Sequence, residues 1–336
     1  NNREVVVVGK IVINLWHIKN TNGLFYYALD YIDHIAAEKI ILLNVNFPNS
    51  EAIERLSGNN KILKLSLLNY VMFMFKCFIE HNLIFTPSSH PIPFIKKQLV
   101  IVHDMYPFHG FKGNLKKILF CISAKISRCK IGYINRSQVL PALLNLGINP
   151  RQLVFAPNKF PDLFSNPLNR IPYDKKKIIV GLVGTDSDKK NYHELLSSIR
   201  HRKLHGQFNL MIYGHETPYF KRVNSDFPDL NISLVKSDET SLRDFLTNIN
   251  ILISICRTEG FGRPIATALV NGVPCFLINC PVFREFFSNS ANVYPTTDEL
   301  INAILEIKDI PINKAFIIPT DVKEAFFSII DMINNG

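Results

Sequence analysis

The sequence predicts an α/β protein of two doubly wound parallel sheets, and three observations support this fold class. Short apolar, β-branched segments alternate with helical patterns from one end of the chain to the other. Such regular alternation is typical of parallel sheets covered by helices on both faces. The length of 336 residues matches about two ordinary domains, and the hydrophobic share of 47% suffices for two cores. This composition excludes a disordered or fibrous chain.

The expected elements follow the apolar segments in chain order. Strands are expected in the first half at 5–15 (one strand or two), 40–45, 83–86, 99–103, 131–135 and 153–155. Helices are expected between them, for example at 23–37 and 113–128. In the second half, strands are expected at 178–183, 208–213, 232–235, 251–255 and 275–278. Helices are expected there near 191–201, 240–248, 264–271 and 296–308.

A segment rich in proline, asparagine and lysine, residues 163–177, separates the halves and is interpreted as an interdomain linker. The predicted organisation is therefore a first domain over 1–162, this linker, a second domain over 178–319 and a final helix over 320–336. The final helix has an amphipathic pattern. Ligands of open α/β sheets bind beyond the carboxyl ends of the strands, so the functional site is expected in the loops that follow strands.

The net charge of +10 is unevenly distributed. Residues 1–165 hold 19 basic and 9 acidic residues, whereas the rest of the chain holds 19 of each. Within residues 61–130 there are 11 basic residues and only two acidic ones, Glu80 and Asp104. A uniformly basic protein would indicate a nucleic-acid binder. The asymmetry instead predicts that one domain meets an anionic partner, unless the lysines only form a solvated face.

The apolar stretches and the cysteines bear on membrane insertion and on disulfide formation. No apolar stretch reaches the roughly 20 residues of a spanning helix, and the nearest one, residues 65–79, contains Lys76. The six cysteines show neither a C-x-x-C pair nor a zinc spacing, so buried thiols in a reducing compartment are expected. The chain begins at Asn1 with no signal-peptide pattern, which predicts a trimmed chain or part of a longer one.

The most informative segment is residues 251–274. It predicts a buried strand, a glycine-containing turn and a helix with Pro264 near its first position, where the missing N–H costs nothing. Gly260 and Gly262 let the backbone approach a ligand, and the amides at the helix start favour an anion such as a diphosphate. Glu259 stands at the end of the strand. Its carboxylate is suited to accept hydrogen bonds from hydroxyls, as on a sugar.

The hexapeptide Glu-Gly-Phe-Gly-Arg-Pro at 259–264, followed by Gly-Val-Pro at 272–274, resembles the signature of retaining glycosyltransferases of the GT-B fold, family 4. The resemblance implies two Rossmann-like domains facing a cleft, with a C-terminal helix that crosses back to the first domain. It implies transfer of a sugar from a nucleotide sugar to a hydroxyl of a glycan or lipid-linked acceptor, with retention and without a metal or other cofactor. Synthesis of a bacterial-type surface polysaccharide or lipopolysaccharide is the expected setting.

The resemblance also implies roles for residues in the second half. Glu259 would be catalytic, and the donor would meet Gly260, Phe261, Gly262 and Arg263.

Upstream, residues 180–196 are similar to the family's glycine- and lysine-containing stretch that binds the donor diphosphate. This similarity points to Gly184 and Lys190, with Lys189 as a one-residue alternative. Thr185 stands where the family has arginine, a loss for which Arg263 or Arg257 would compensate.

In the first half, Leu-Val-Ile-Val-His-Asp at 99–104 is similar to the family segment whose histidine reaches the transferred sugar, which makes His103 the second catalytic candidate. Gly23 falls where the family has a glycine loop that offers amides to the donor phosphate. Asn22 and His17 are weaker candidates, for which turn or packing roles are the alternative. Asn158 matches the family's turn at the end of the first domain and is interpreted as structural.

One departure concerns the donor nucleotide. Thr267 replaces a second glutamate that usually holds the ribose hydroxyls. Loss of that carboxylate favours a deoxyribose donor, such as a thymidine diphosphate sugar. Asp186-Ser-Asp188 fits a metal-binding D-x-D triplet, but two adjacent lysines would compete with the cation, so no metal is expected.

Three other classes remain open at this stage. A sugar-nucleotide epimerase shares the fold, and the substitutions at Thr185 and Thr267 would suit an inactive partner subunit. A dinucleotide-dependent dehydrogenase is disfavoured, because the first strand is not followed by G-x-G-x-x-G.

In the GT-B fold that the resemblance implies, the first domain binds the acceptor, so the basic excess of this domain bears on the acceptor. It predicts contact with an anionic, lipid-linked acceptor or an acidic membrane surface, where each nearby Lys or Arg contributes about 1 kcal/mol. The expected location is the cytoplasm, peripheral at the inner face of the membrane. No nucleic-acid partner is expected.

Overall fold

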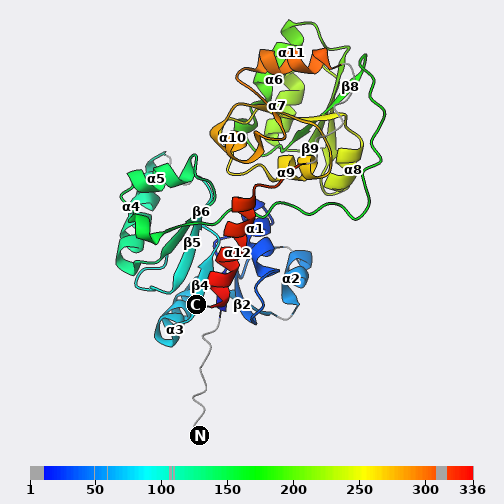
Figure 1. Ribbon diagram of the computed structural model, residues 1–336. Coiled ribbons are helices and arrows are strands. Elements are labelled where there is room, and N and C mark those ends of the chain that lie inside the picture. Colours follow the sequence, from blue (N-terminus) through cyan, green and yellow to red (C-terminus); the bar gives the residue numbers. More distant parts are fainter. Residues whose placement is uncertain are drawn as a thin grey trace. The chain divides into compact units, whose positions relative to one another are not determined.

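The computed structural model describes residues 11–48, 50–58, 60–105, 108, 110–307 and 316–335. The chain divides into two compact units (Figure 1). The first unit consists of Asn1–Lys159 and Thr320–Gly336, and the second of Phe160–Pro319. Residues 5–10 of the first expected strand lie outside the described residues.

The first unit contains a seven-stranded parallel sheet with the order β3-β2-β1-β4-β5-β6-β7. Its strands are β1 (Ile11–Asn14), β2 (Lys39–Asn44), β3 (Lys61–Leu65), β4 (Leu83–Thr86), β5 (Gln98–Val102), β6 (Lys130–Tyr133) and β7 (Leu153–Phe155). Its helices are α1 (Gly23–Ile32), α2 (Ser50–Ser57), α3 (Leu67–Glu80), α4 (Gly110–Ser127), α5 (Val139–Asn145) and α12 (Thr320–Asn334). The strand order reverses between β1 and β4, so the topological switch point of this sheet lies there.

The second unit repeats this plan with a six-stranded parallel sheet in the order β10-β9-β8-β11-β12-β13. Its strands are β8 (Ile178–Val183), β9 (Phe208–Gly214), β10 (Ile232–Lys236), β11 (Ile251–Ser254), β12 (Cys275–Ile278) and β13 (Asn292–Tyr294). Its helices are α6 (Tyr192–His201), α7 (Pro218–Asp226), α8 (Leu242–Thr247), α9 (Arg263–Val270), α10 (Pro281–Phe287) and α11 (Thr297–Glu306). The switch point falls between β8 and β11. The predicted fold class of two doubly wound sheets is confirmed.

Both faces of the first sheet are covered. Successive residues of a strand point to opposite faces, and here both faces carry apolar side chains that must be buried. Ile13 of β1 belongs to a core that includes α1 and α12, whereas Val12 belongs to a separate cluster with Tyr70, Met74 and Cys77 of α3. The apolar stretch recognised in the sequence is therefore α3, which buries only one side. In the described part of the chain, no helix combines the length and the apolar character that a membrane span requires.

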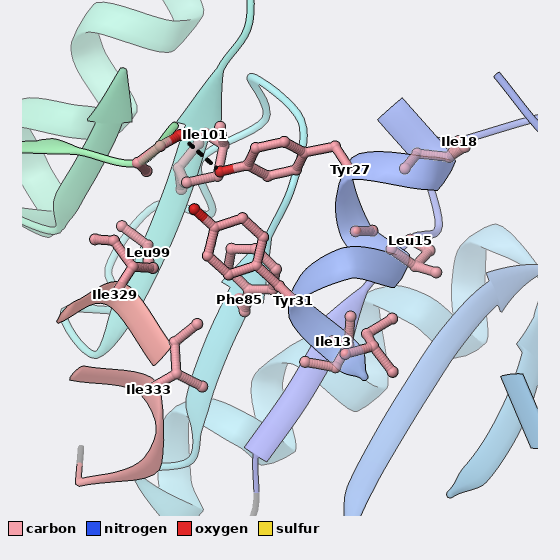
Figure 2. Close-up of a cluster of buried hydrophobic side chains, with 14 of the residues drawn as sticks. Ile13, Leu15, Ile18, Tyr27, Tyr31, Phe85, Leu99, Ile101, Ile329 and Ile333 are labelled. Atoms are coloured by element: carbon pink, nitrogen blue, oxygen red, sulfur yellow. Dashed lines mark hydrogen bonds between the residues drawn. The ribbon is translucent and has the colours of Figure 1, made fainter. Parts of the chain in front are cut away.

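The C-terminal helix α12 packs on the first unit, as predicted. The ring of Phe326 lies 4.6 Å from that of Tyr31 on α1, and Asp321 at the start of α12 pairs with Arg136. Ile329 and Ile333 enter the same core (Figure 2). The chain therefore returns to its first unit after completing the second.

Two buried tyrosines of α1 fix the end of the first unit. The hydroxyl of Tyr27 donates to the carbonyl of Ala156 at 2.9 Å (Figure 2), and that of Tyr31 donates to the carbonyl of Pro157 at 2.8 Å. These bonds hold the turn that contains the buried Asn158.

The segment interpreted as a linker lies against the second unit. Residues 160–177 cluster with that unit. Arg170 donates to the carbonyls of Asn250 and Gly272, and the amide of Phe164 donates to Asn271 Oδ1 at 2.8 Å. A proline-rich composition marked the absence of regular structure correctly but could not show these side-chain anchors.

Candidate functional site

The switch point of the second sheet brings two predicted loops together. β8 is followed by Gly184 and the turn that leads to Lys190, and β11 is followed by the turn that contains Glu259. Lys190 Nζ lies 3.6 Å from Glu259 Oε2. Because the ligands of doubly wound sheets bind outside the carboxyl ends of strands at the switch point, this charged pair lies where a ligand is expected.

Gly184 makes room for Lys190. Its φ of +99° is a conformation that residues with side chains rarely adopt, and a Cβ atom there would lie 2.6 Å from Lys190 Cε. The Gly184 carbonyl accepts a hydrogen bond of 2.6 Å from the hydroxyl of Tyr192. Glycine is therefore needed here both for the turn and for the path of the lysine side chain.

The charge of Lys190 is balanced by its surroundings. Its side chain is 18% exposed and that of Glu259 is 19% exposed. Burial lowers the pKa of Lys190, but the charges of Glu259, Cys256 and Asp186 outweigh burial and raise it. The lysine is consequently cationic at neutral pH, and Lys190, Glu259 and Gly262 line a hollow of about 20 Å³.

The N-terminus of α9 forms the other side of this hollow. Gly262 precedes the helix with a φ of +91°, and a Cβ atom there would approach Ile265 to 3.1 Å and Phe283 to 3.3 Å. Pro264 lies in the first turn, where no intrahelical partner for its nitrogen is needed. The first amides of a helix lack partners within the helix and carry its positive dipole end. The site therefore combines an ammonium, a carboxylate and a helix N-terminus.

Not every predicted donor residue faces this site with its side chain. Phe261 is 3% exposed, and its ring packs against Phe160 at 5.1 Å and Phe286 at 5.0 Å, inside the second unit. A donor contact at Phe261 would have to use the backbone. The Thr267 hydroxyl donates to the carbonyl of Arg263 at 3.0 Å, within its own helix. Gly260 and Arg263 are partly exposed at the same turn.

Glu194 is a site residue that the sequence analysis did not single out. It pairs with Arg257 at 2.9 Å and also accepts hydrogen bonds from Thr297 and Asn191. Burial raises the pKa of Glu194, but these hydrogen bonds outweigh burial and lower it. Glu194 thereby holds Arg257, one of the two arginines considered as a phosphate partner. Its position four residues after Lys190, on the first turn of α6, was the available signal.

The D-x-D triplet has other partners in the structure. The Asp188 carboxylate pairs with Arg222, and Asp186 contributes to the charge around Lys190. In the ranges that the structure describes, no three side chains of His, Cys, Asp or Glu gather in a way that could hold a metal ion.

The remaining predicted residues belong to the first unit. His103 follows β5; its Nε2 is 3.1 Å from the Pro87 carbonyl, and its ring meets Tyr27 edge-on at 4.4 Å. Gly23 is exposed and begins α1. Asn22 caps this helix, because its side chain accepts hydrogen bonds from the amides of Leu24 and Phe25. The alternative turn role of Asn22 is thus the observed one.

The two parallel-sheet, Rossmann-like domains, with a C-terminal helix on the first, are the architecture of GT-B glycosyltransferases. Residues 168–317, which include the Lys190–Glu259 site, match the model of the family described as glycosyl transferases group 1. In this match and in its fold the chain is similar to glycosyltransferases of the GT-B fold.

Individual relatives agree with this class. The chain is 25% identical over 241 residues to the O-antigen chain mannosyltransferase RfbU of Salmonella typhimurium, a match that spans 67% of this chain and 64% of the relative's length. Among solved structures, Anabaena HepE in complex with UDP and glucose aligns with a TM-score of 0.72 at 14% identity, covering 97% of both chains. WaaG, a glycosyltransferase involved in lipopolysaccharide biosynthesis, aligns with a TM-score of 0.65 at 12% identity, covering 97% of this chain and all of its own. These structural similarities concern the fold.

Proposed function

We propose that this protein transfers a sugar from a nucleotide-sugar donor to a hydroxyl of a glycan or lipid-linked acceptor, with retention at the anomeric carbon and without a bound metal. The family 4 assignment belongs to this proposal. The observation that carries it is the Lys190–Glu259 pair at the switch point of the domain that matches the glycosyltransferase model.

The geometry suits a diphosphate leaving group. As the bond to the sugar breaks, negative charge develops on the diphosphate, and a fixed ammonium with helix amides stabilises such charge. Lys190 would supply the ammonium, and the start of α9 would supply the amides. Glu259 keeps Lys190 charged and oriented until the donor arrives, and then accepts hydrogen bonds from the sugar.

The acceptor is proposed from the relatives and from the first unit. One relative is named an O-antigen chain mannosyltransferase, and one structural neighbour is a glycosyltransferase involved in lipopolysaccharide biosynthesis. A surface polysaccharide built on a lipid is the acceptor we propose, with the enzyme at the cytoplasmic face of the membrane. His103 is proposed to contact the transferred sugar, as the resemblance implies. The sequence departures at Thr185 and Thr267 make donor binding the first property to measure.

The test is calorimetric titration of the protein with nucleoside diphosphates. Lys190→Ala removes one charge-assisted contact, so it is expected to weaken binding about ten- to a hundredfold. Lys189→Ala is the matched control, because this neighbouring lysine is exposed, and it should leave binding unchanged. Equal affinities of wild type and Lys190→Ala would overturn the proposed site. No binding by the wild type would favour an inactive partner subunit.

The same titration identifies the nucleotide. The neighbour HepE binds UDP, whereas Thr267 favours a donor that lacks the 2′-hydroxyl. The deoxyribose hypothesis predicts tighter binding of dTDP than of UDP or GDP. A clear preference for a ribonucleotide would eliminate it.

Membrane association is proposed on a second set of residues. α3 and α4 expose large apolar side chains next to the lysines of residues 61–130. Flotation with vesicles should therefore recover the protein when the vesicles contain anionic lipid, and less of it when they are neutral. Recovery that does not depend on lipid charge would contradict this role of the lysines.

A further inference from the structure

The first unit contains a cavity of about 620 Å³ that the donor site does not use. It lies beside the switch point of the first sheet, since the loops after β1 and β4 contribute His17 and the segment from Ser89 to Ile95. The remaining lining comes from α3, α4 and Phe108. By the rule that located the donor site in the second unit, this is the ligand-binding edge of the first sheet. Its volume lies within the range of small-molecule pockets.

The walls of the cavity are hydrocarbon and aromatic. α3 contributes Val71, Met74 and Phe75, and α4 contributes Leu119 and Phe120. Several of these side chains continue onto the surface: Val71 is 55% exposed, Phe75 is 64% exposed and Leu119 is 56% exposed. An exposed apolar patch that continues into an open apolar cavity indicates a ligand whose chain enters from an apolar surface.

Stacked rings form part of the cavity wall. His17 and His90 lie parallel with centroids 4.0 Å apart, and Trp16 stacks on Tyr70 at 4.5 Å. Burial and the charge of His90 lower the pKa of His17 to about 3, and burial and Lys116 lower the pKa of His90 to about 4. Both imidazoles are therefore neutral at physiological pH. The imidazoles themselves therefore offer the ligand no charge, and the charged group that acts on His90 is Lys116.

The loop on one side of the cavity is held in place. The buried Gln98 side chain accepts a hydrogen bond from the Ile92 amide and donates to the carbonyls of Ile92 and Ile95. This bracket keeps Phe94 at a φ of 69°, with its ring 66% exposed. A free chain would rarely adopt this left-handed backbone at a phenylalanine, least of all with the residue exposed. The loop is preorganised to present apolar surface.

Charge is confined to the rim. Among the described residues that line the cavity there is one lysine, Lys116 of α4. The next residue, Lys117, does not line the cavity. The segment around the cavity, residues 61–130, carries 11 basic and two acidic residues. An apolar interior with a cationic rim is complementary to a long hydrocarbon chain that ends in an anionic group.

We propose that this cavity binds the hydrocarbon chain of a phosphate-bearing lipid acceptor, with Lys116 facing the phosphate. The proposal rests on the proposed glycosyltransferase function, because it assigns the lipid part of that enzyme's acceptor. The chain enters between α3 and α4. The phosphate stays at the rim with the lysine.

The chain's single tryptophan, Trp16, provides the readout. It contacts Tyr70, which lines the cavity. The probe is dodecyl phosphate with a bromine at the end of its chain, used below its micelle concentration. Bound in the cavity, the bromine should quench Trp16 fluorescence saturably. Alkyl phosphates of increasing length should compete up to about fourfold more tightly for each added CH₂ group.

Two pairs of variants locate the probe. Ser123→Phe fills the cavity from α4 and should weaken binding about tenfold or more, whereas Ile126→Phe one turn further, outside the lining, should not. Lys116→Gln should weaken dodecyl phosphate several-fold and leave dodecanol unchanged, and Lys117→Gln should change neither. Circular dichroism of each variant establishes that it is folded.

The outcomes separate this inference from the proposed function. Absence of saturable quenching, or binding that ignores both chain length and Ser123→Phe, overturns the cavity assignment. Binding of dodecanol and dodecyl phosphate with equal affinity overturns the role of Lys116. Nucleoside diphosphate binding is measured on the same samples and is expected to depend on Lys190. If the wild type binds the alkyl phosphate but no nucleoside diphosphate, the donor site is refuted and the hydrocarbon cavity is retained.

Discussion

Gly184 determines where the central lysine of the second unit can lie. Its hydrogen atom occupies the position from which a Cβ would meet Lys190 Cε at 2.6 Å, and its φ is +99°. The lysine in turn approaches Glu259. One residue without a side chain thus permits both the backbone turn and the charged pair.

Replacing Gly184 by alanine is expected to weaken both the fold and the site. The left-handed backbone costs a residue with a side chain about 1 to 2 kcal/mol, and Lys190 must move because its flexible end is what the new methyl group meets. We expect a lower free energy of unfolding together with weaker nucleoside diphosphate binding, measured by urea unfolding and calorimetry.

Gly206→Ala is the control for this substitution, because at that glycine a new methyl group would have no neighbouring atom within 4 Å and the backbone has no positive φ. It should affect neither measurement. If Gly184→Ala bound the nucleotide as the wild type does, the link between the glycine and the lysine would be refuted.

The residues of the proposed donor site were accessible to sequence reasoning in two ways. Glu259 was found at the end of a predicted strand, and the resemblance pointed to Gly184 and Lys190 in the loop after another strand. The structure places Lys190 Nζ 3.6 Å from Glu259 Oε2. Phe261 was less predictable, since a glycine-containing turn does not reveal that the ring within it points into a cluster of phenylalanines. The cavity was not predictable either. It arises from α3, α4, Phe108 and the loops after β1 and β4, which are far apart in the sequence and share only a mainly apolar character.

At the scale of elements, the C-terminal helix is the clearest long-range connection. α12 brings Phe326, which is 2% exposed, and a row of isoleucines onto α1. Because the amphipathic period was regular, its buried face could be predicted from the sequence. The partner surface could not, and its placement on the first unit came from the resemblance.

Phe326→Ala should destabilise the first unit by about 3 to 5 kcal/mol, the usual cost of removing a buried phenylalanine side chain. Trp16 belongs to the first unit, so its fluorescence in urea reports the unfolding of that unit. Phe327→Ala is the matched control on the same helix, because Phe327 is 43% exposed. Equal effects of the two substitutions would contradict the packing of α12.

The loops after β1 and β4 give the first unit a pH-dependent stability. Unfolded histidine has a pKa near 6.5, whereas His17 titrates at about 3 and His90 at about 4 in the fold. Between these values the unfolded chain binds protons that the folded chain does not, so stability falls as the pH is lowered from 6.5 toward 4. Each histidine contributes a slope of at most about 1.4 kcal/mol per pH unit, and less for His90 because this residue is exposed.

His90→Gln should flatten this slope in Trp16-monitored urea unfolding. It removes one of the two protonations and also the charge that protonated His90 would impose on His17. Lys116 of α4, which faces His90, remains in place. Differences at neutral pH measure packing and the contact of His90 with the Ser88 hydroxyl at 3.2 Å, since both imidazoles are then neutral in the fold and largely neutral in the unfolded chain. A slope identical to that of the wild type would show that His90 is protonated in the fold.

At the scale of the whole molecule, both units contain a parallel sheet with its switch point next to the first strand, and they differ in the number of strands. The central strands of both sheets are continuous apolar runs and were predicted, for example β4 and β8. Of the four edge strands, β7 and β10 were predicted, whereas β3 and β13 were not. β3 mixes lysines with its apolar residues, and β13 begins with a polar asparagine and has only three residues. Edge strands bury less surface, so their sequences carry a weaker pattern.

The six cysteines, all within the described part of the chain, test the packing of both units together. All are free thiols, five are buried, and Cys121 on α4 is half-buried. Burial raises the pKa of Cys77 and Cys280 to about 11, and it also raises the pKa of Cys129, Cys256 and Cys275. These five thiols therefore lack both access and thiolate character at neutral pH.

Thiol titration with Ellman's reagent should show one reactive cysteine in the native protein and all six in concentrated guanidinium. Cys121→Ser should abolish the native reaction while leaving the total in denaturant one lower. A second fast thiol would locate an opening in whichever unit contains it, because Cys77, Cys121 and Cys129 belong to the first unit and Cys256, Cys275 and Cys280 to the second. Fewer than six thiols in denaturant without reductant would mean a disulfide, which the packing of six separate free thiols excludes.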